Sequence, residues 1–222
     1  MAIDMLRYNY RTGVVKQKGS RKLWVAVPLI AVLGGAYLLV NVLSPSLQLP
    51  FDAPQDATAK KLVTSKPDPT QNRLYIPQIN LDVPILEGDD ESVLSRGTWH
   101  RQPDNGDPVD GGNFVLSANR FSLGMTPMQT RNQSPFYYVN QLNDGDQFYV
   151  DFEGTRYAYE VVKKYAVELT DVSIEKRSDQ PKLTLYAYEP GGLQPGQEVI
   201  EAKPVGTIAW VNGAAKLQAS RF

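Results

Sequence analysis

The sequence predicts a mostly β protein in which one membrane-spanning helix precedes a closed or nearly closed β-barrel with short helices. Two observations support this fold class. Residues 23–43 form an unbroken run of 21 residues without a charged side chain. From residue 73 onward the chain divides into about eight short segments of alternating apolar and polar residues, with little helical material between them.

The apolar run is long enough to cross a lipid bilayer. At about 1.5 Å per residue it spans roughly 30 Å, which is the thickness of a hydrocarbon core. It is apolar on all sides, unlike the amphipathic helix of a soluble protein. Pro28 and Asn41 interrupt it only near its ends, where a lipid helix tolerates them. We therefore expect a retained membrane anchor at 23–43.

A cleaved signal peptide is the alternative. The run is longer than a typical signal core, and no small-x-small cleavage pattern follows it. Residues 1–22 carry six basic side chains and one acidic side chain, whereas Asp52 and Asp56 lie beyond the run. This asymmetry predicts a cytoplasmic basic tail at 1–22 and an extracellular C-terminal domain, that is, a single-pass protein of the cell membrane.

Composition excludes several classes of function. The formal net charge is −1, so a tail of +5 leaves −6 on the remainder, which argues against a nucleic-acid partner. The chain has no cysteine, which rules out disulfides, zinc–thiolate sites and a thiol nucleophile. A single histidine, His100, is too few for a histidine metal site. We expect no metal and no cofactor.

Residues 44–72 are expected to be a linker. They contain five prolines and many small or polar residues. A stalk of this kind would hold the next domain some tens of ångströms from the bilayer, on the flexible-chain estimate of about 5–6 Å × √n. A short helix is expected within it, around residues 57–63.

The extracytoplasmic domain, 73–222, is expected to consist of short strands. Pro77 and Pro84 punctuate its first alternating stretch, which suits edge strands. Glu153–Gly154 lies between two alternating segments and predicts a hairpin turn. The expected strands lie within 73–86, 112–119, 147–152, 156–167, 182–188 and 198–206, and the expected helical stretches are 87–94 and 135–141.

The order of these segments resembles that of a sortase, the cysteine transpeptidase that attaches proteins to Gram-positive cell walls or polymerises pili. The matching stretches are RLYIPQINLDVPIL, RGTWHRQPDNGDPVDGGNFVLSANR, PFYYVNQLNDGDQFYVDFEGTRYAYEV and PKLTLYAYEP, which together cover essentially all of 73–206. The resemblance implies a closed eight-stranded β-barrel with an active-site groove at one end. It also implies a surface protein, a pilin or a sorting-signal-like peptide as partner.

Family chemistry needs a cysteine nucleophile, a histidine that moves protons and an arginine that stabilises the oxyanion. In this chain GNFVLSANR places Asn119 at the histidine position, and LTLYAY places Tyr188 at the cysteine position, after Ala187. The segment QEVIEA places Gln197, or else Glu198, at the arginine position, because the preceding loop PGGLQPG varies in length between relatives. None of the three catalytic side chains is carried over.

These replacements disfavour catalysis. A phenol has a pKa near 10, so Tyr188 supplies almost no phenolate at neutral pH unless a strong base lies beside it. Asn119 has no titratable proton, and Gln197 carries no charge for a developing oxyanion. Disabling a comparable triad in a serine protease costs about six orders of magnitude in turnover, and we expect a similar loss here.

Several side chains near these positions are expected to line the groove. Tyr188 fills it with an aromatic ring, Tyr186 points to the same side, and Trp99 with His100 packs at a strand end beside it. Whether this surface binds a peptide or plugs the cleft stays open. The candidate lining residues are Trp99, His100, Asn119, Arg120, Tyr186 and Tyr188.

Two acidic clusters have simpler readings than a metal site. Asp104, Asn105, Asp107 and Asp110 match no calcium-loop spacing and are typical of a turn. The run 89–91 is expected to be a solvated loop that leads into a helix N-terminus.

The favoured interpretation is a membrane-anchored, catalytically inactive sortase-like protein that binds or scaffolds cell-surface proteins or envelope assemblies. The alternative is an active transpeptidase with non-standard residues, such as Tyr188 with His100. A third reading is a purely structural barrel whose groove is plugged by Tyr188.

Overall fold

The computed structural model describes residues 7–9, 14–16, 21–47, 56–188, 196–211 and 214–219. The chain forms two compact units, Met1–Val40 and Asn41–Phe222. Much of the expected basic tail, residues 48–55 of the expected linker and residues 190–195 of the variable loop lie outside the described residues.

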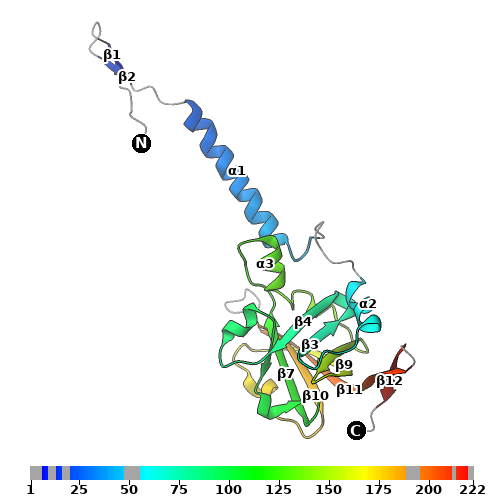
Figure 1. The fold of residues 1–222 in the computed structure, drawn as a ribbon. Helices are drawn as coiled ribbons and strands as arrows, with labels where there is room; N and C mark the ends of the chain where they lie inside the picture. Colours follow the sequence, from blue (N-terminus) through cyan, green and yellow to red (C-terminus); the bar gives the residue numbers. More distant parts are fainter. Residues whose placement is uncertain are drawn as a thin grey trace. The chain divides into compact units, whose positions relative to one another are not determined.

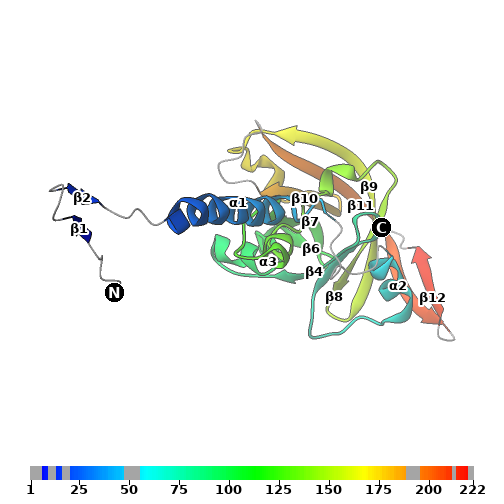
Figure 2. The ribbon, with the colours of Figure 1, turned by 90° about the horizontal axis from the view of Figure 1, so that it is seen from above.

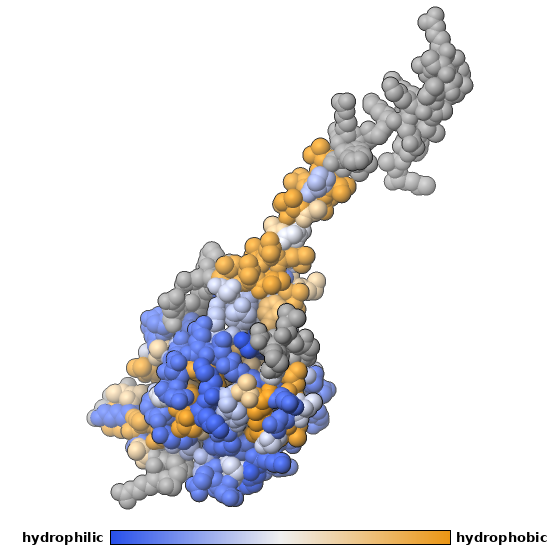
Figure 3. Space-filling model, turned by 180° about the vertical axis from the view of Figure 1, so that it is seen from behind, coloured by the Kyte–Doolittle hydropathy of each residue, from blue (hydrophilic) through white to orange (hydrophobic). Residues whose placement is uncertain are grey.

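The first unit holds a strand pair and most of one long helix. β1 (Arg7–Asn9) pairs antiparallel with β2 (Val14–Lys16), and α1 (Arg21–Leu43) follows. Figure 3 shows apolar residues along this helix. Its segment Val25–Leu43 has the length and composition of a membrane span or of a signal sequence.

The second unit contains a closed barrel of eight strands (Figures 1 and 2), as predicted. The sheet runs in the order β10-β11-β9-β8-β3-β4-β5-β7, and a parallel pairing of β7 with β10 closes it. The barrel strands are β3 (Arg73–Ile76), β4 (Leu81–Leu86), β5 (Thr98–Arg101), β7 (Gly111–Asn119), β8 (Gln147–Phe152), β9 (Thr155–Val167), β10 (Lys182–Tyr188) and β11 (Gln197–Val211).

Two further strands extend this sheet. β6 (Gly106–Asp107) pairs with the start of β7, and β12 (Ala214–Ala219) forms a hairpin with the end of β11. β11 therefore continues beyond residue 206, where the sequence pattern ended the strand. Where this extension begins, Gly206 adopts φ +153°, and a Cβ at this position would lie 2.2 Å from the Gln218 carbonyl oxygen.

Strand alternation divides the side chains into an interior face and an outer face. On β7 and β10 every second residue enters the main core, where Leu116 and Leu185 are fully buried. The residues between them, such as Val115 and Tyr186, belong to a separate cluster on the outer face. The position of a residue along its strand therefore tells whether its side chain points into the barrel or lies on the outer face.

The predicted hairpin between β8 and β9 is confirmed. Its two turn residues, Glu153 and Gly154, adopt φ values of +49° and +79°. Positive φ at both positions is the signature of a type I′ turn, whose twist matches that of the flanking strands. The register Phe152↔Thr155 continues without a bulge to Gln147↔Glu160.

The expectation of edge strands around Pro77 and Pro84 is wrong. β3 lies between β4 and β8, and β4 lies between β3 and β5. Pro77 stands outside the strands because it begins a 3-10 turn, η1 (Pro77–Ile79). Pro84 precedes the two residues at which β4 pairs with β5, so the sheet tolerates it there.

The helices that follow α1 are short and only partly as expected. α2 (Ala57–Thr64) confirms the helix predicted near 57–63, whereas α3 (Pro127–Asn132) was not predicted. The stretches expected to be helical at 87–94 and 135–141 contain only 3-10 turns. The remaining 3-10 turns are η2 (Glu91–Ser95), η3 (Pro103–Asn105), η4 (Val139–Gln141) and η5 (Val172–Glu175).

A buried arginine fastens α2 to the barrel. Arg156 is 1% exposed, and its guanidinium donates to both Asp151 carboxylate oxygens at 2.6 and 2.8 Å. The same group donates to the carbonyl oxygens of Leu62 and Ser65 at 2.6 and 3.0 Å and lies over the Trp210 ring at 5.1 Å. The part of the expected linker that includes α2 is thus packed against the barrel.

Candidate functional site

The three positions that the family resemblance aligns with catalytic residues, Asn119, Tyr188 and Gln197, lie on adjacent strands of the sheet. Asn119 and Tyr188 are register partners at the C-terminal ends of the parallel strands β7 and β10. The antiparallel register of β10 with β11 ends at the pair Tyr186↔Val199, and the same register continued by two residues would align Gln197 with Tyr188. We call Asn119, Tyr188 and Gln197 the strand-end row.

Alternation places this row on the outer face of the barrel. Ala118 and Ala187 belong to the interior core, so the side chains that follow them point outward. Gln197 shares its face with Val199, which packs in the outer cluster, whereas Glu198 has the opposite parity. The register therefore brings Gln197 rather than Glu198 to the side of Tyr188.

The 3-10 turn η2 engages two members of the row. Asn119 Nδ2 donates to the Leu94 carbonyl oxygen at 3.2 Å, and Tyr188 Oη donates to Glu91 Oε1 at 2.6 Å. The Tyr188 ring also packs against the cluster formed by Val93, Leu94 and Trp99. Both side chains are thus held by a segment of the chain itself.

η2 is fixed at its N-terminal end. The Asp90 carboxylate accepts from the backbone N–H of Ser92 at 2.8 Å, which caps the turn. Trp99 Nε1 donates to the Gly88 carbonyl oxygen at 3.0 Å, just before the turn begins. The turn η2, which contacts Asn119 and Tyr188, is therefore an ordered part of this end of the barrel.

The environment of Tyr188 favours the neutral phenol. Partial burial, the hydrogen bond to Glu91 and the negative charge of that carboxylate raise the pKa of Tyr188 to about 12. At neutral pH this leaves roughly one phenolate in 10⁵ molecules. Tyr188 in this setting is a hydrogen-bond donor to Glu91.

Tyr186 belongs to a second polar network on the same face. Its hydroxyl donates to Glu175 Oε1 at 2.6 Å, and Arg101 Nε donates to the same oxygen at 2.9 Å. The Arg101 guanidinium also lies 4.1 Å from the centroid of the Trp99 ring. Burial and this carboxylate raise the pKa of Tyr186.

The two tyrosines do not form one continuous aromatic platform. Tyr186 packs with Val115, Ile174 and Val199, whereas Tyr188 packs in the cluster around Trp99. They share the outer face, as the spacing of two residues along a strand predicts. Each ring is nevertheless held by its own carboxylate.

His100 lies on the other side of the sheet from Tyr188, contrary to its expected place in the groove. Its buried ring meets Phe114 edge-on at 4.8 Å, within the interior face. Its Nε2 lies 3.1 Å from the Gly106 carbonyl oxygen and its Nδ1 lies 3.3 Å from Glu87 Oε1. Trp99, one residue earlier on the strand, faces outward. This geometry gives no support to a Tyr188–His100 catalytic pair.

Arg120 borders the row without offering a free cation to it. Its backbone N–H donates to the Tyr188 carbonyl oxygen at 3.0 Å. Its guanidinium Nη1 lies 3.7 Å from Glu198 Oε2. The charge of Arg120 is therefore partly compensated by the residue that follows Gln197.

The acidic stretch after β5 has the hydrogen bonding of a turn. Asp107 Oδ1 accepts from the backbone N–H groups of Val109 and Asp110 at 2.6 and 2.7 Å. Asn105 donates to the Glu175 carbonyl oxygen at 2.9 Å. Beside this turn, at the end of β7 and β10 opposite the row, is a hollow of about 250 Å³ whose lining includes Tyr159 and Pro181.

Sequence reasoning missed the carboxylates that bind the two tyrosines. Glu91 was expected in a solvated loop, and Glu175 was not singled out. Arg101 could have been placed on the outer face, because it is two residues from Trp99 on one strand. No local pattern points to Glu91 or Glu175, because each meets its tyrosine only through the folding of a loop onto the barrel.

Comparisons with known proteins agree with the fold. A family model described as Sortase domain matches residues 74–205. A curated relative, Sortase D of Bacillus subtilis (strain 168), is 29% identical over 153 residues, which cover 66% of this chain and 71% of the relative.

Solved structures of sortases share the barrel. Listeria monocytogenes sortase A superposes with a TM-score of 0.52 at 15% identity, covering 66% of this chain and 90% of that one. A Clostridium perfringens sortase D5 transpeptidase gives 0.51 at 18% identity, covering 70% and 91%. Sortase E1 from Streptomyces coelicolor, solved with a tripeptide in its active site, gives 0.51 at 20% identity, covering 62% and 88%.

Proposed function

The chain belongs to the sortase family, and on that premise we propose that it is a non-catalytic member that acts by binding at the cell surface. One observation carries the proposal. The strand-end row has asparagine, tyrosine and glutamine where sortase chemistry uses histidine, cysteine and arginine, and the chain contains no cysteine that could act from elsewhere.

The neighbours of Tyr188 also oppose a substitute mechanism. A tyrosine nucleophile needs a group that removes its proton, but partial burial and the carboxylate of Glu91 raise the pKa of the phenol to about 12. The side-chain amide of Asn119 donates to the Leu94 carbonyl oxygen and does not titrate near neutral pH. Gln197 brings no positive charge to an oxyanion.

The apolar helix supports a place at the membrane. We propose that Val25–Leu43 is retained as a single-pass anchor, with the basic tail in the cytoplasm and the barrel outside the cell. An anchored barrel can then hold a partner beside the envelope without modifying it.

The proposed partner is an extended peptide of the sorting-signal type, carried by a surface protein or a pilin. The outer face near the row presents the Tyr188 ring and the Arg101 guanidinium, which lies over the buried Trp99 ring, a combination of aromatic and cationic groups suited to a peptide ligand. Glu91 and Leu94 already contact the row, so a peptide must displace η2 or bind beside it.

Peptide binding tests this proposal. The full chain in detergent micelles is titrated against a fluorescent sorting-signal peptide, with anisotropy as the readout. We expect saturable binding that weakens about tenfold or more in Tyr188→Ala, because the ring beside the row is removed. Val109→Ala, an exposed apolar residue in the turn before β7, is the control and should bind normally. Absence of binding by the parent chain would contradict the binding role.

A structural role is the second candidate. It is favoured by the contacts of η2, because Glu91 and Leu94 already occupy the hydrogen-bonding groups of Tyr188 and Asn119. In that case the parent and Tyr188→Ala would both fail to bind peptide, while Tyr188→Ala would lower the stability of the barrel.

A further inference from the structure

We infer that the segment between β7 and η4, residues 120–138, lies against the lipid bilayer with the side chains of Leu123, Met125 and Met128 in the lipid interface. This segment, which contains α3, is called the α3 loop below. The inference rests on the anchorage in the proposed function, but not on the absence of catalysis. It assigns a phospholipid surface as the partner of one particular loop.

Hydrogen bonds connect the α3 loop to the residues that end the apolar span. The span runs to Leu43, and Asn41 near its end donates through Nδ2 to the Gly124 carbonyl oxygen at 3.0 Å. Thr130, on α3, donates through its hydroxyl to Asn41 Oδ1. These three residues belong to the same compact unit. The α3 loop is therefore in direct contact with a residue of the span. If the bilayer holds the span as far as Leu43, its surface lies next to this loop.

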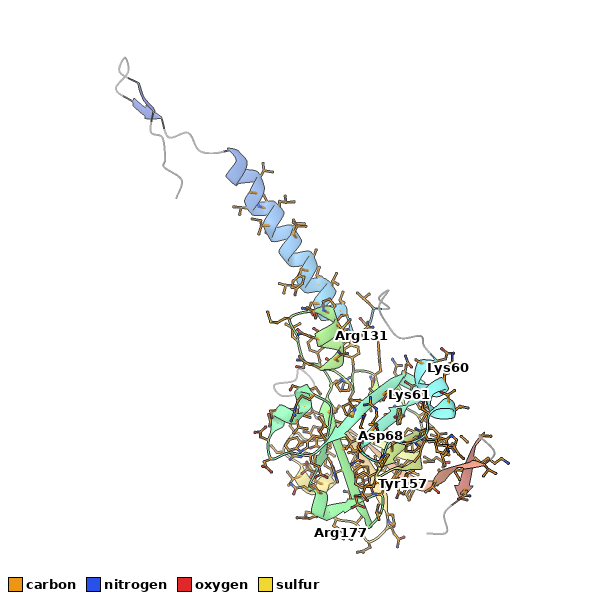
Figure 4. All side chains as sticks on the ribbon, viewed as in Figure 1. Lys60, Lys61, Asp68, Arg131, Tyr157 and Arg177 are labelled. Atoms are coloured by element: carbon orange, nitrogen blue, oxygen red, sulfur yellow. The ribbon has the colours of Figure 1, made fainter. Side chains whose placement is uncertain are left out.

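The segment just after the span is held in the same way. Arg131, labelled in Figure 4, donates through Nη2 to the carbonyl oxygens of Ser44 and Leu47. Ser44 is fully buried, although it lies only one residue beyond the span. A long free stalk therefore does not begin directly after the helix, as the linker composition had suggested.

Internal hydrogen bonds define the shape of the α3 loop. The Thr130 hydroxyl accepts from the backbone N–H of Gly124 at 3.0 Å. Ser134 Oγ donates to the Thr130 carbonyl oxygen at 2.6 Å and accepts from the backbone N–H of Ser122 at 3.0 Å. The polar residues therefore satisfy one another inside the loop, whereas Leu123, Met125 and Met128 remain on its surface.

Three large apolar side chains are exposed on the α3 loop. Leu123 is 53% exposed, Met125 is 82% exposed and Met128 is 50% exposed. They lie within six residues of one another, next to residues that contact Asn41. Exposed apolar groups concentrated beside a span favour partition into the headgroup and acyl boundary of a bilayer.

Charge and aromatic content of the loop fit the same partner. Residues 120–143 contain two arginines and no acidic residue, although the chain beyond the basic tail has a net charge of −6. An anionic lipid surface attracts such a segment. The ring centroids of Phe121 and Tyr137 lie 6.4 Å apart, and those of Tyr137 and Tyr138 lie 4.9 Å apart. All three residues are half-buried. Aromatic rings of this kind are enriched at membrane interfaces.

The absence of cysteine permits a direct test by single-site labelling. The full chain is reconstituted in phospholipid vesicles that contain phosphatidylglycerol, with one nitroxide on Leu123→Cys, Met125→Cys or Met128→Cys. Collisions of the nitroxide with oxygen, which concentrates in lipid, and with a nickel chelate, which stays in water, are measured by electron paramagnetic resonance. Val32→Cys within the span is the lipid reference, and Val109→Cys, 58% exposed in the turn before β7, is the aqueous reference.

We expect the three loop labels to show several-fold lower nickel accessibility than the Val109→Cys label and oxygen accessibility between those of Val109→Cys and Val32→Cys, because oxygen is most concentrated at the bilayer centre. Loop labels as accessible to nickel as Val109→Cys, with the Val32→Cys label in lipid, would overturn this inference alone. An aqueous Val32→Cys label would overturn the anchorage and this inference together. Neither result bears on whether the barrel cleaves a peptide, so the non-catalytic role is judged separately.

Discussion

Tyr188 occupies the end of β10 with its hydroxyl 2.6 Å from a carboxylate oxygen of Glu91. Partial burial and this contact stabilise the neutral phenol, so the pKa rises to about 12 in the folded chain from an ordinary value near 10. Because the folded-state pKa is the higher one, the stabilisation is present below pH 10 and is lost as the pH rises through 12.

Replacing Glu91 should lower the pKa of Tyr188. In Glu91→Gln the negative charge is gone while a hydrogen-bond acceptor remains, so we expect the pKa to move toward 10. The readout is the pH titration of ¹³Cζ-labelled tyrosine by NMR, with the Tyr188 signal assigned by its loss in Tyr188→Phe. Glu160→Gln, on strand β9 and paired with Lys203, is the control. An unchanged titration in Glu91→Gln would contradict the assigned cause.

At the residue scale the sequence could identify Asn119 and Tyr188, because short motifs carry both positions. Strand alternation could also have separated His100 from Trp99, since neighbours on one strand face opposite ways. The partners of the tyrosines could not be predicted. Glu91 is 97 residues from Tyr188, and the loop that brings it there has no periodic pattern.

Among the elements, α2 shows how a segment outside the matched domain becomes part of the fold. Its attachment depends on the Arg156 guanidinium, which neutralises Asp151 and satisfies the carbonyl groups of Leu62 and Ser65. Tyr75 lies under the same guanidinium at 5.2 Å. One side chain thus connects β8, β9 and β3 with the helix before the barrel.

Arg156→Ala should therefore destabilise the second unit by about 3–5 kcal/mol, because it leaves Asp151 buried without a partner and two carbonyl groups without donors. Chemical denaturation followed by tryptophan fluorescence measures this change. Lys203→Ala is the matched control, because it breaks the exposed pair with Glu160 and should cost less than about 1 kcal/mol. Equal effects of the two variants would refute the role given to Arg156.

The elements with strong local signals were predictable. Glu153–Gly154 fixed a hairpin, and the composition near 57–63 indicated a helix. α3 was missed although Thr126 and Pro127 form a good start, in which the Thr126 hydroxyl accepts from the Gln129 N–H at 3.2 Å. The helix has only six residues, so no apolar period could reveal it. The edge-strand prediction failed because β8 and β5 flank the β3–β4 pair, so both strands are paired on both sides.

At the scale of the whole molecule, the strand-end row exists because β7 pairs in parallel with β10 and closes the barrel. Residues 69 apart in sequence become register partners through that closure. Alternation predicts strands but not which distant strands pair. The row was therefore predicted from the order of the segments that resemble the family, and not from a local pattern. The comparisons support the same order over residues 74–205.

The intact mass of the full chain after incubation with a sorting-signal peptide tests the central claim most directly. The variant Asn119→His/Tyr188→Cys/Gln197→Arg serves as the comparison, since it restores a thiol, a proton carrier and a cation in one row. We predict an unmodified parent chain and an intact peptide, with an acyl adduct only in the triple variant. An acyl adduct on the parent chain would contradict the account. So would cleavage of the peptide by the parent chain that is lost in the Tyr188→Phe variant.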